Sequence, residues 1–272
     1  MSRIAVVEFP GTNCMVETAE AVRATGARAE VVLWNASFAS SRGFDGYVIA
    51  GGFAYEDRVR AGAIAAKHAI LDAIAEAAAA GRPVLGVCNG AQVLVEAGLV
   101  PGIEPGSVQV ALARNASEGW RGYYCEWVHL RADARRGFLH ALSARGVLPM
   151  PVGHGEGRFT GDPEFFAELD RRGQVALRYV RPDGGEALGF PDNPNGSLRD
   201  AAALCDPSGC VVAMMPHPER AAWLFQVPLA LSGAWGARRR QAADDAARLR
   251  GAGPGLALYA AMVHAASTAE VG

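Results

Sequence analysis

The chain has few features that would direct it to a nucleic acid, a membrane or the outside of the cell. Its 272 residues carry 26 basic and 28 acidic side chains, a formal net charge of -2. We therefore expect no general attraction to nucleic acid or to an anionic membrane. No uninterrupted apolar stretch approaches membrane-spanning length, and the N-terminal residues reach a charge before a signal-peptide core could form. We expect a cytoplasmic protein.

Cysteine pairs and phosphate-binding glycine motifs are also missing. The five cysteines stand at positions 14, 88, 125, 205 and 210 without a Cys-x-x-Cys pair, which argues against a disulfide framework and against a structural zinc site. The first apolar run is followed by Phe9-Pro10-Gly11-Thr12-Asn13 rather than by a glycine-rich phosphate loop. We expect neither a metal nor ATP to be bound by this chain itself.

Apolar residues, by contrast, make up 50% of the chain and suffice for a large buried core. Over the first third, short β-rich runs alternate with helical patterns, the rhythm of βαβ units. Such short, continuously apolar runs fit strands that are buried on both faces of a parallel sheet. We expect strands at 4–7, 30–33, 47–49 and 84–85, and helices near 14–25 and 60–80.

The remainder of the chain predicts antiparallel additions to that sheet. The segments 108–112 and 123–128 are strand-like, and further strands are expected at 147–150, 175–179 and 211–214, with a final helix at 256–266. No linker is evident, so we expect one domain over 1–272, with a core of about 3–222 plus 253–268 and a helical insertion at 225–252. The fold class is α/β, with an open, mostly parallel, doubly wound sheet.

One cysteine has the surroundings of a nucleophile. Cys88 follows the apolar run 83–85 and precedes a helical stretch, with small residues on both sides in Gly86-Val87-Cys88-Asn89-Gly90. This pattern predicts a strained strand-to-helix turn that exposes one side chain, as in a nucleophile elbow. A free thiol, with a pKa of ~8.5, is mostly protonated at neutral pH, so it needs activation by a helix N-terminus or a histidine.

Two histidines could serve as the base for Cys88. His217 and Glu219 follow the expected strand at 211–214, and His154 and Glu156 follow the strand at 147–150. Functional groups of an open parallel sheet gather at the carboxyl ends of its strands, so either pair could reach the sulfur. The same two pairs could hold a metal, but that arrangement would leave Cys88 without a base, so we prefer catalysis.

Attack on a carbonyl also requires donors for the developing oxyanion. The turn Gly51-Gly52 follows the expected strand at 47–49 and can present backbone amides. We expect the N–H groups of Gly52 and Asn89 to form the oxyanion hole, with an ordinary tight turn as the plain alternative for the glycines.

These residues belong to a set of motifs that resembles the triad-type, class I glutamine amidotransferases. More narrowly, the chain resembles the glutaminase subunits of phosphoribosylformylglycinamidine synthase, and the matches run in order along the chain up to about residue 222. The motifs are Pro10-Gly11-Thr12-Asn13-Cys14, Gly51-Gly52-Phe53-Ala54-Tyr55, Arg60-Ala61-Gly62-Ala63-Ile64-Ala65, Gly86-Val87-Cys88-Asn89-Gly90-Ala91-Gln92, His154-Gly155-Glu156-Gly157-Arg158-Phe159, Asn193-Pro194-Asn195-Gly196-Ser197 and Met214-Met215-Pro216-His217-Pro218-Glu219-Arg220.

The resemblance implies a flavodoxin-like fold and a role for each motif residue. Cys88 would be the nucleophile, His217 the general acid and base, and Glu219 the group that orients His217. Gly51 and Gln92 would contact the glutamine substrate. His154 and Glu156 would shape the glutamine pocket or the face toward a partner.

The resemblance also implies the reaction and the partners. Glutamine would be hydrolysed to glutamate and ammonia through a thioester on Cys88, for use in purine biosynthesis. The ammonia would pass to a large synthetase subunit that uses ATP and Mg, with a small subunit bridging the assembly. The chain departs from the family pattern at Ala54 and Glu56, where Ser and Gly are usual. An amidotransferase subunit for another synthetase, and a catalytically silent regulatory subunit, are the alternative functions.

Overall fold

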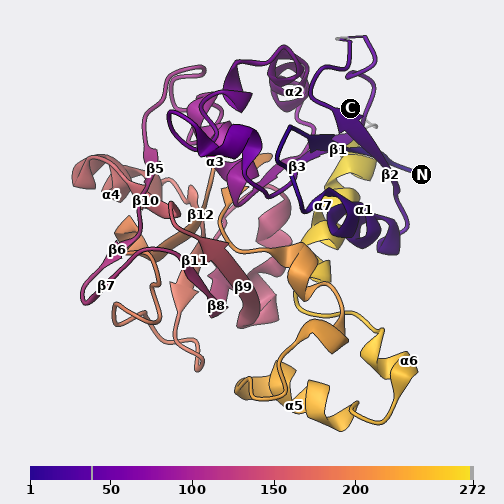
Figure 1. The fold of residues 1–272 in the computed structure, drawn as a ribbon, viewed down its shortest axis with the longest axis vertical. Coiled ribbons are helices and arrows are strands. Elements are labelled where there is room, and N and C mark those ends of the chain that lie inside the picture. Colours follow the sequence, from indigo (N-terminus) through magenta and orange to yellow (C-terminus); the bar gives the residue numbers. More distant parts are fainter. Residues whose placement is uncertain (38, 270–272) are drawn as a thin grey trace.

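The computed structural model describes residues 1–37 and 39–269 and is organised around one large sheet. Its strands in chain order are β1 (Arg3–Glu8), β2 (Arg28–Leu33), β3 (Gly46–Ile49), β4 (Val84–Val87), β8 (Tyr124–Ala132), β9 (Leu148–His154), β11 (Val175–Val180), β12 (Ala201–Cys205) and β13 (Val211–Met214). They lie side by side in the order β2-β1-β3-β4-β13-β12-β11-β8-β9 (Figure 1). The pairs from β2 to β13 are parallel, and those from β13 to β9 are antiparallel.

This arrangement confirms the predicted α/β fold with antiparallel additions. The parallel strands β1, β3, β4 and β13 are buried along almost their whole length, as their uninterrupted apolar runs indicate. The sheet register places the carboxyl ends of these four strands along one edge, because parallel neighbours end on the same side. Any side chains that follow these strands therefore meet there.

Helices cover the sheet. They are α1 (Met15–Ala24), α2 (Ile70–Ala79), α3 (Asn89–Glu96), α4 (Pro163–Arg171), α5 (Gly233–Gln241), α6 (Ala246–Leu249) and α7 (Leu256–Thr268). Helix α1 packs against β1, β2 and α7, whereas α3 packs against β3, β4 and β13. Figure 1 shows α1 and α7 together, with α2 across strand β1 from them. Among the described residues, no helix combines the length and apolar character that crossing a bilayer would require.

Two predicted elements are wrong in extent. The expected helix at 60–80 is α2 alone, preceded by turns and a short 3-10 segment, Ala65–Lys67. Two residues interrupt the helix: His68 is extended, with ψ 145°, and Gly62 has φ 80°, where a Cβ would lie 2.6 Å from the backbone carbon of Gln92. A continuous helix would require a negative φ at this close approach of two segments.

The expected strand at 108–112 is the second correction. Only β5 (Ala111–Ala113) forms, and it pairs with β10 (Arg158–Thr160) in a separate two-stranded sheet instead of extending the large one. A second small hairpin, β6 (Ala116–Ser117) with β7 (Trp120–Arg121), follows it. Strand β5 packs against α3, and β10 follows β9 in the chain, a placement that periodicity in a single segment does not reveal.

Strand β12 and helix α4 were also not predicted from the sequence. Strand β12 is Ala-Ala-Ala-Leu-Cys, and its alanines have low β propensity, so only pairing and full burial between β11 and β13 make it a strand. Helix α4 does have a signal: the Asp162 side chain accepts from the backbone N–H of Glu164, and Pro163 stands in the first helical turn.

The segment 223–252, which lies between the site motifs and helix α7, leaves the body of the fold and returns to it beside its own starting point. It contains α5 and α6 (Figure 1), and its ends are joined by an antiparallel bridge between Trp223 and Ala252. Leu224, Val227, Leu231 and Ala242 form its own small apolar cluster. The segment is therefore anchored at its base while most of it packs locally.

Candidate active site

The site lies at the carboxyl edge of the parallel strands. Cys88 directly follows β4, Gly51 and Gly52 follow β3 by one residue, and His217 stands shortly after β13. The predicted convergence at this edge is observed: Cys88 and Gly52 line one cavity of about 180 Å³, together with Gln92, His154 and Glu156.

Cys88 occupies the strained turn that the sequence predicted. Its φ of 51° and ψ of -105° lie outside the regions that L-residues favour, and its backbone N–H donates to the Met214 carbonyl at 2.7 Å. A Cβ on Gly86 would lie 2.5 Å from the Gly90 carbonyl oxygen, and one on Gly90 would lie 2.0 Å from the Ile49 carbonyl oxygen. The flanking glycines thus allow α3 to begin directly over the sheet, with its N-terminus at the cysteine.

His217 and Glu219 form a buried hydrogen-bonded pair. The ring Nδ1 lies 2.5 Å from Glu219 Oε1, and the side chains are 3% and 0% exposed. The His217 backbone N–H donates to the Pro151 carbonyl, which fixes the residue between β13 and β9. The second ring nitrogen, Nε2, is buried without a hydrogen-bond partner among the described residues. The carboxylate fixes the tautomer at Nδ1, so Nε2 is the nitrogen left for proton transfer.

The charges around His217 favour its protonated form. Burial opposes a charged ring, but the Glu219 carboxylate and a thiolate at Cys88 outweigh it and raise the pKa of His217 well above its usual value. Burial likewise opposes ionisation of Glu219, yet the contact with His217 lowers the pKa of that carboxyl. The site therefore favours an imidazolium at His217 beside an ionised Glu219.

His154 has a different environment. Its Nδ1 lies 3.1 Å from Asn115 Oδ1, and Asn115 Nδ2 donates to the His154 carbonyl at 2.7 Å. Burial, with repulsion from His217, lowers the pKa of His154 to about 3. His154 ends strand β9 and is 3% exposed, and Asn115 holds it in place. A neutral ring beside an amide is suited to shaping the cavity and cannot deliver protons at neutral pH.

The side chains of Asn89 and Gln92 hold the walls of the cavity to helix α3. Asn89 Oδ1 accepts from the Ala54 backbone N–H at 2.9 Å, and Asn89 Nδ2 donates to Gln92 Oε1 at 2.9 Å. Gln92 Nε2 donates to the Glu156 carbonyl at 2.6 Å. Both loops beside the nucleophile are thereby tied to the helix that carries it.

The two glycines after β3 have distinct surroundings. Gly52 lines the cavity, and neither its N–H nor that of Asn89 forms a hydrogen bond to another described residue. Their pairing as an oxyanion hole stays a prediction. Gly51 does not line the cavity but packs behind the catalytic ring, where a Cβ would lie 2.9 Å from His217 Cε1. Packing against His217 thus gives one reason for glycine here, and the predicted contact with the substrate stays a prediction.

A second cysteine, Cys14, lies beside the His217 ring and was missed from the sequence. Cys14 Sγ accepts a hydrogen bond from Arg220 Nη2 at 3.0 Å and lies 4.0 Å from His217 Nδ1. The ligand-type atoms of Cys14, His217 and Glu219 lie within 4.8 Å of one another. In this structure Cys14 Sγ accepts from Arg220, and His217 Nδ1 is paired with Glu219, so each of these atoms already has a protein partner. The signal in the sequence was the motif that ends in Cys14, whose place after β1 puts it at the same edge.

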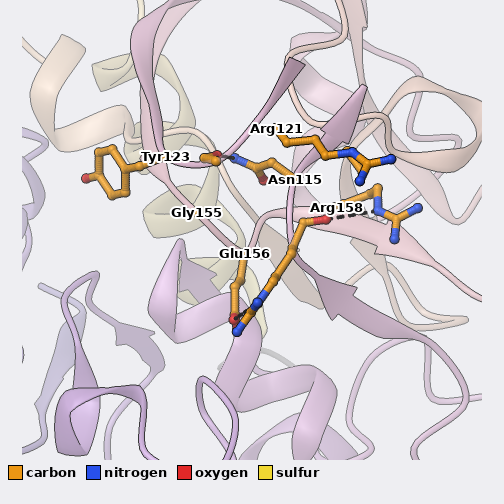
Figure 2. A pocket seen from close by; sticks show the side chains of 9 residues that line it. Asn115, Arg121, Tyr123, Gly155, Glu156 and Arg158 are labelled. Atoms are coloured by element: carbon orange, nitrogen blue, oxygen red, sulfur yellow. Dashed lines mark hydrogen bonds and ion pairs between the residues drawn. The ribbon is translucent and has the colours of Figure 1, made fainter. Parts of the chain in front are cut away.

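A larger cavity of about 590 Å³ adjoins the first and shares Tyr123, Gly155 and Glu156 with it. Figure 2 shows Arg121 and Arg158 along one side of it, with the Glu156 side chain pointing away from them. Glu156 Oε1 lies 3.6 Å from Arg114 Nε, so the boundary between the two cavities carries an ion pair. The site therefore opens toward a basic surface.

Comparison with known proteins agrees with this geometry. Residues 1–247 match a family described as a CobB/CobQ-like glutamine amidotransferase domain. The chain belongs to this glutamine amidotransferase family.

Relatives within the family narrow the comparison. The phosphoribosylformylglycinamidine synthase subunit PurQ of Methanothrix thermoacetophila is 43% identical over 83% of this chain and 89% of its own length. The protein of the same name from Thermus thermophilus is 44% identical over 80% of this chain and 89% of its own. A chain in the structure of PurLQS from Thermotoga maritima superposes with a TM-score of 0.69 at 28% identity, covering 97% of this chain and 99% of that one.

Proposed function

We propose that this chain is the glutaminase subunit of a phosphoribosylformylglycinamidine synthase, which hydrolyses glutamine and supplies ammonia for purine biosynthesis. The observation that carries the proposal is the buried His217–Glu219 pair, whose free Nε2 lies at the same strand edge as the strained Cys88. The PurQ relatives, which match over four fifths of the chain, support the choice of acceptor pathway.

The chemistry follows from these groups. The Cys88 thiolate adds to the carboxamide carbon of glutamine, and the Gly52 and Asn89 amides stabilise the oxyanion. The C–N bond then breaks, and ammonia leaves with a proton supplied by His217, which yields a γ-glutamyl thioester. Water attacks the thioester while His217 accepts its proton, the C–S bond breaks, and glutamate leaves with the Cys88 thiolate and the imidazolium restored. Glu219 keeps the ring oriented throughout.

The partners complete the reaction. We propose a large synthetase subunit that uses ATP and Mg to activate formylglycinamide ribonucleotide, and a small subunit that bridges the assembly. The relative from Thermotoga maritima, solved as PurLQS, supports a multi-subunit complex. We propose that the complex works in the cytoplasm.

Cysteine replacement tests this function. In the Cys88→Ala variant, release of ammonia from glutamine should fall to the buffer background, because no thioester can form. The matched control is Cys210→Ala, which removes a partly exposed thiol from the turn before β13 and should retain wild-type activity. Glutaminase activity that survives unchanged in Cys88→Ala would refute the mechanism.

The acceptor is tested separately. Glutaminase rates should be measured with and without the synthetase, formylglycinamide ribonucleotide and ATP, and the synthetase should form amidine from glutamine only when the active subunit is present. Productive coupling to a different synthetase would favour another amidotransferase pathway. Absence of turnover and of Cys88 labelling, even with all partners present, would favour a silent regulatory subunit.

A further inference from the structure

Asp57 is a cavity-lining carboxylate without a cation. It lines the 180 Å³ cavity with Cys88, and its Oδ1 accepts a hydrogen bond from Asn89 Nδ2 at 3.1 Å. Asn89 directly follows the nucleophile, so one hydrogen bond connects the carboxylate to the residue beside Cys88. Within residues 1–37 and 39–269, Asp57 takes part in no salt bridge.

Glu156, the other carboxylate that lines this cavity, does take part in a salt bridge. Glu156 lies 3.6 Å from Arg114 and therefore already has a counterion. Glu56, next to Asp57, is exposed and is paired with Arg58 at 2.8 Å outside the cavity. Only Asp57 among these three acidic groups faces the cavity with its charge uncompensated.

The substrate carries the missing charge. Glutamine has a single cation, its α-ammonium, which a short aliphatic chain separates from the carboxamide that Cys88 attacks. A cavity of about 180 Å³ that holds both Cys88 and Asp57 can receive the two ends of one small amino acid. Charge-assisted hydrogen bonds of this type are stronger and more selective than neutral ones.

We propose that Asp57 binds the α-ammonium group of glutamine and so restricts the site to the free amino acid, an inference that rests on the glutaminase function proposed above. Burial and the nearby Glu156 charge raise the pKa of Asp57, which agrees with a carboxylate that awaits a cation. The positive charge of a bound ammonium would stabilise the ionised form of Asp57. Glutamine within a peptide lacks the α-ammonium, so the site would spare protein glutamines and release no ammonia from them.

The test compares two substrates in the full-length chain assembled with its synthetase. Glutamine and glutaramate, the same amide without the amino group, are assayed for glutamate or glutarate release. In Asp57→Asn, KM for glutamine should rise about 10- to 100-fold with kcat changed less than about 3-fold, since the lost contact is one charged hydrogen bond. The preference for glutamine over glutaramate in kcat/KM should fall by the same factor. Glu56→Gln, which removes a neighbouring carboxylate outside the cavity, is the matched control and should keep the wild-type preference.

Labelling separates this proposal from the glutaminase function itself. The rate at which 6-diazo-5-oxonorleucine, which carries an α-ammonium, alkylates Cys88 should fall in Asp57→Asn and recover partly in Asp57→Glu. The rate with iodoacetamide, which has no amino group, should be unchanged. A wild-type preference in Asp57→Asn would overturn the inference, as would equal losses with both reagents in both variants, which would assign Asp57 to loop structure. A wild-type chain without any glutaminase activity would instead refute the proposed function.

Discussion

Two buried histidines at the same edge of the sheet differ because of their nearest polar partner. His217 is paired with a carboxylate, which stabilises its positive charge, whereas His154 is paired with the Asn115 amide, which does not. The directions of their pKa shifts follow: that of His217 is raised and that of His154 is lowered to about 3. Burial and repulsion from His217 keep His154 neutral, whereas the charges beside His217 outweigh its burial and favour the protonated ring.

This difference predicts the effect of Glu219→Gln. The variant should lose kcat by about 100- to 10,000-fold, because the tautomer is no longer fixed and the imidazolium is no longer stabilised. Since Glu219 raises the pKa of His217, its removal lowers that pKa, and the imidazolium is lost at lower pH. The alkaline limb of the kcat/KM profile should therefore move toward lower pH.

Steady-state assays across pH would measure both effects. The melting temperature of Glu219→Gln should be recorded beside them, so that an unfolded variant is not mistaken for an inactive one. An unshifted alkaline limb would show that His217 does not titrate in the reaction.

At the scale of elements, helix α3 organises the site through its first four residues. Cys88 stands at its N-terminus, the Asn89 side chain holds the loop after β3, and the Gln92 side chain holds the loop after β9. The helix can do this because Gly90 lets it lie against the backbone of β3. Strand, turn and helix therefore act as one unit in shaping the cavity.

That packing predicts a strong response to Gly90→Ala. The added Cβ would overlap the Ile49 carbonyl oxygen at 2.0 Å, so α3 must shift from β3. We expect the free energy of unfolding to fall by about 1–3 kcal/mol, as is usual for overpacking, together with a loss of glutaminase activity. Urea denaturation would measure the first effect.

Gly155→Ala is the matched stability control. Its Cβ would meet only the Tyr123 ring edge, at an ordinary distance of 3.8 Å, so its unfolding midpoint should stay near that of the wild type. Equal stability of the two alanine variants would mean that the helix tolerates displacement from the sheet.

At the scale of the whole molecule, the segment that contains α5 and α6 is separable from the catalytic edge. Its ends meet at the Trp223–Ala252 bridge, and its apolar cluster is mostly its own. One contact does reach the site: Gln226 Nε2 donates to the Glu219 carbonyl at 3.1 Å. The part beyond Gln226 therefore has no hydrogen bond to the triad in the described chain.

Replacing residues 229–248 with a short Gly-Ser linker tests this separation. The rate of Cys88 labelling by 6-diazo-5-oxonorleucine should remain within about 2-fold of wild type. The reason is that the free energy of closing a surface loop changes little with its length, so shortening this segment should leave the rest of the fold in place. Co-purification with the synthetase should be measured on the same variant. A loss of labelling in a folded variant would show that the segment supports the catalytic edge.

Much of the architecture followed from local patterns. Continuous apolar runs identified the parallel strands, and small residues around Cys88 identified the elbow, because both signals depend on a few adjacent residues. The long helix predicted at 60–80 failed at Gly62, and strand β12 was missed, because a close backbone approach and full burial override local propensity.

The sequence by itself determined the fold class, and it predicted Cys88 as the nucleophile and two histidine motifs as candidates for its base. Only the tertiary structure showed that a carboxylate meets His217 while an amide meets His154, that Cys14 and Arg220 lie against the catalytic ring, and that Asp57 faces the cavity without a cation. The physical reason is that strands and turns arise from neighbouring residues, whereas the charge state of a buried group depends on side chains brought to it from distant parts of the chain.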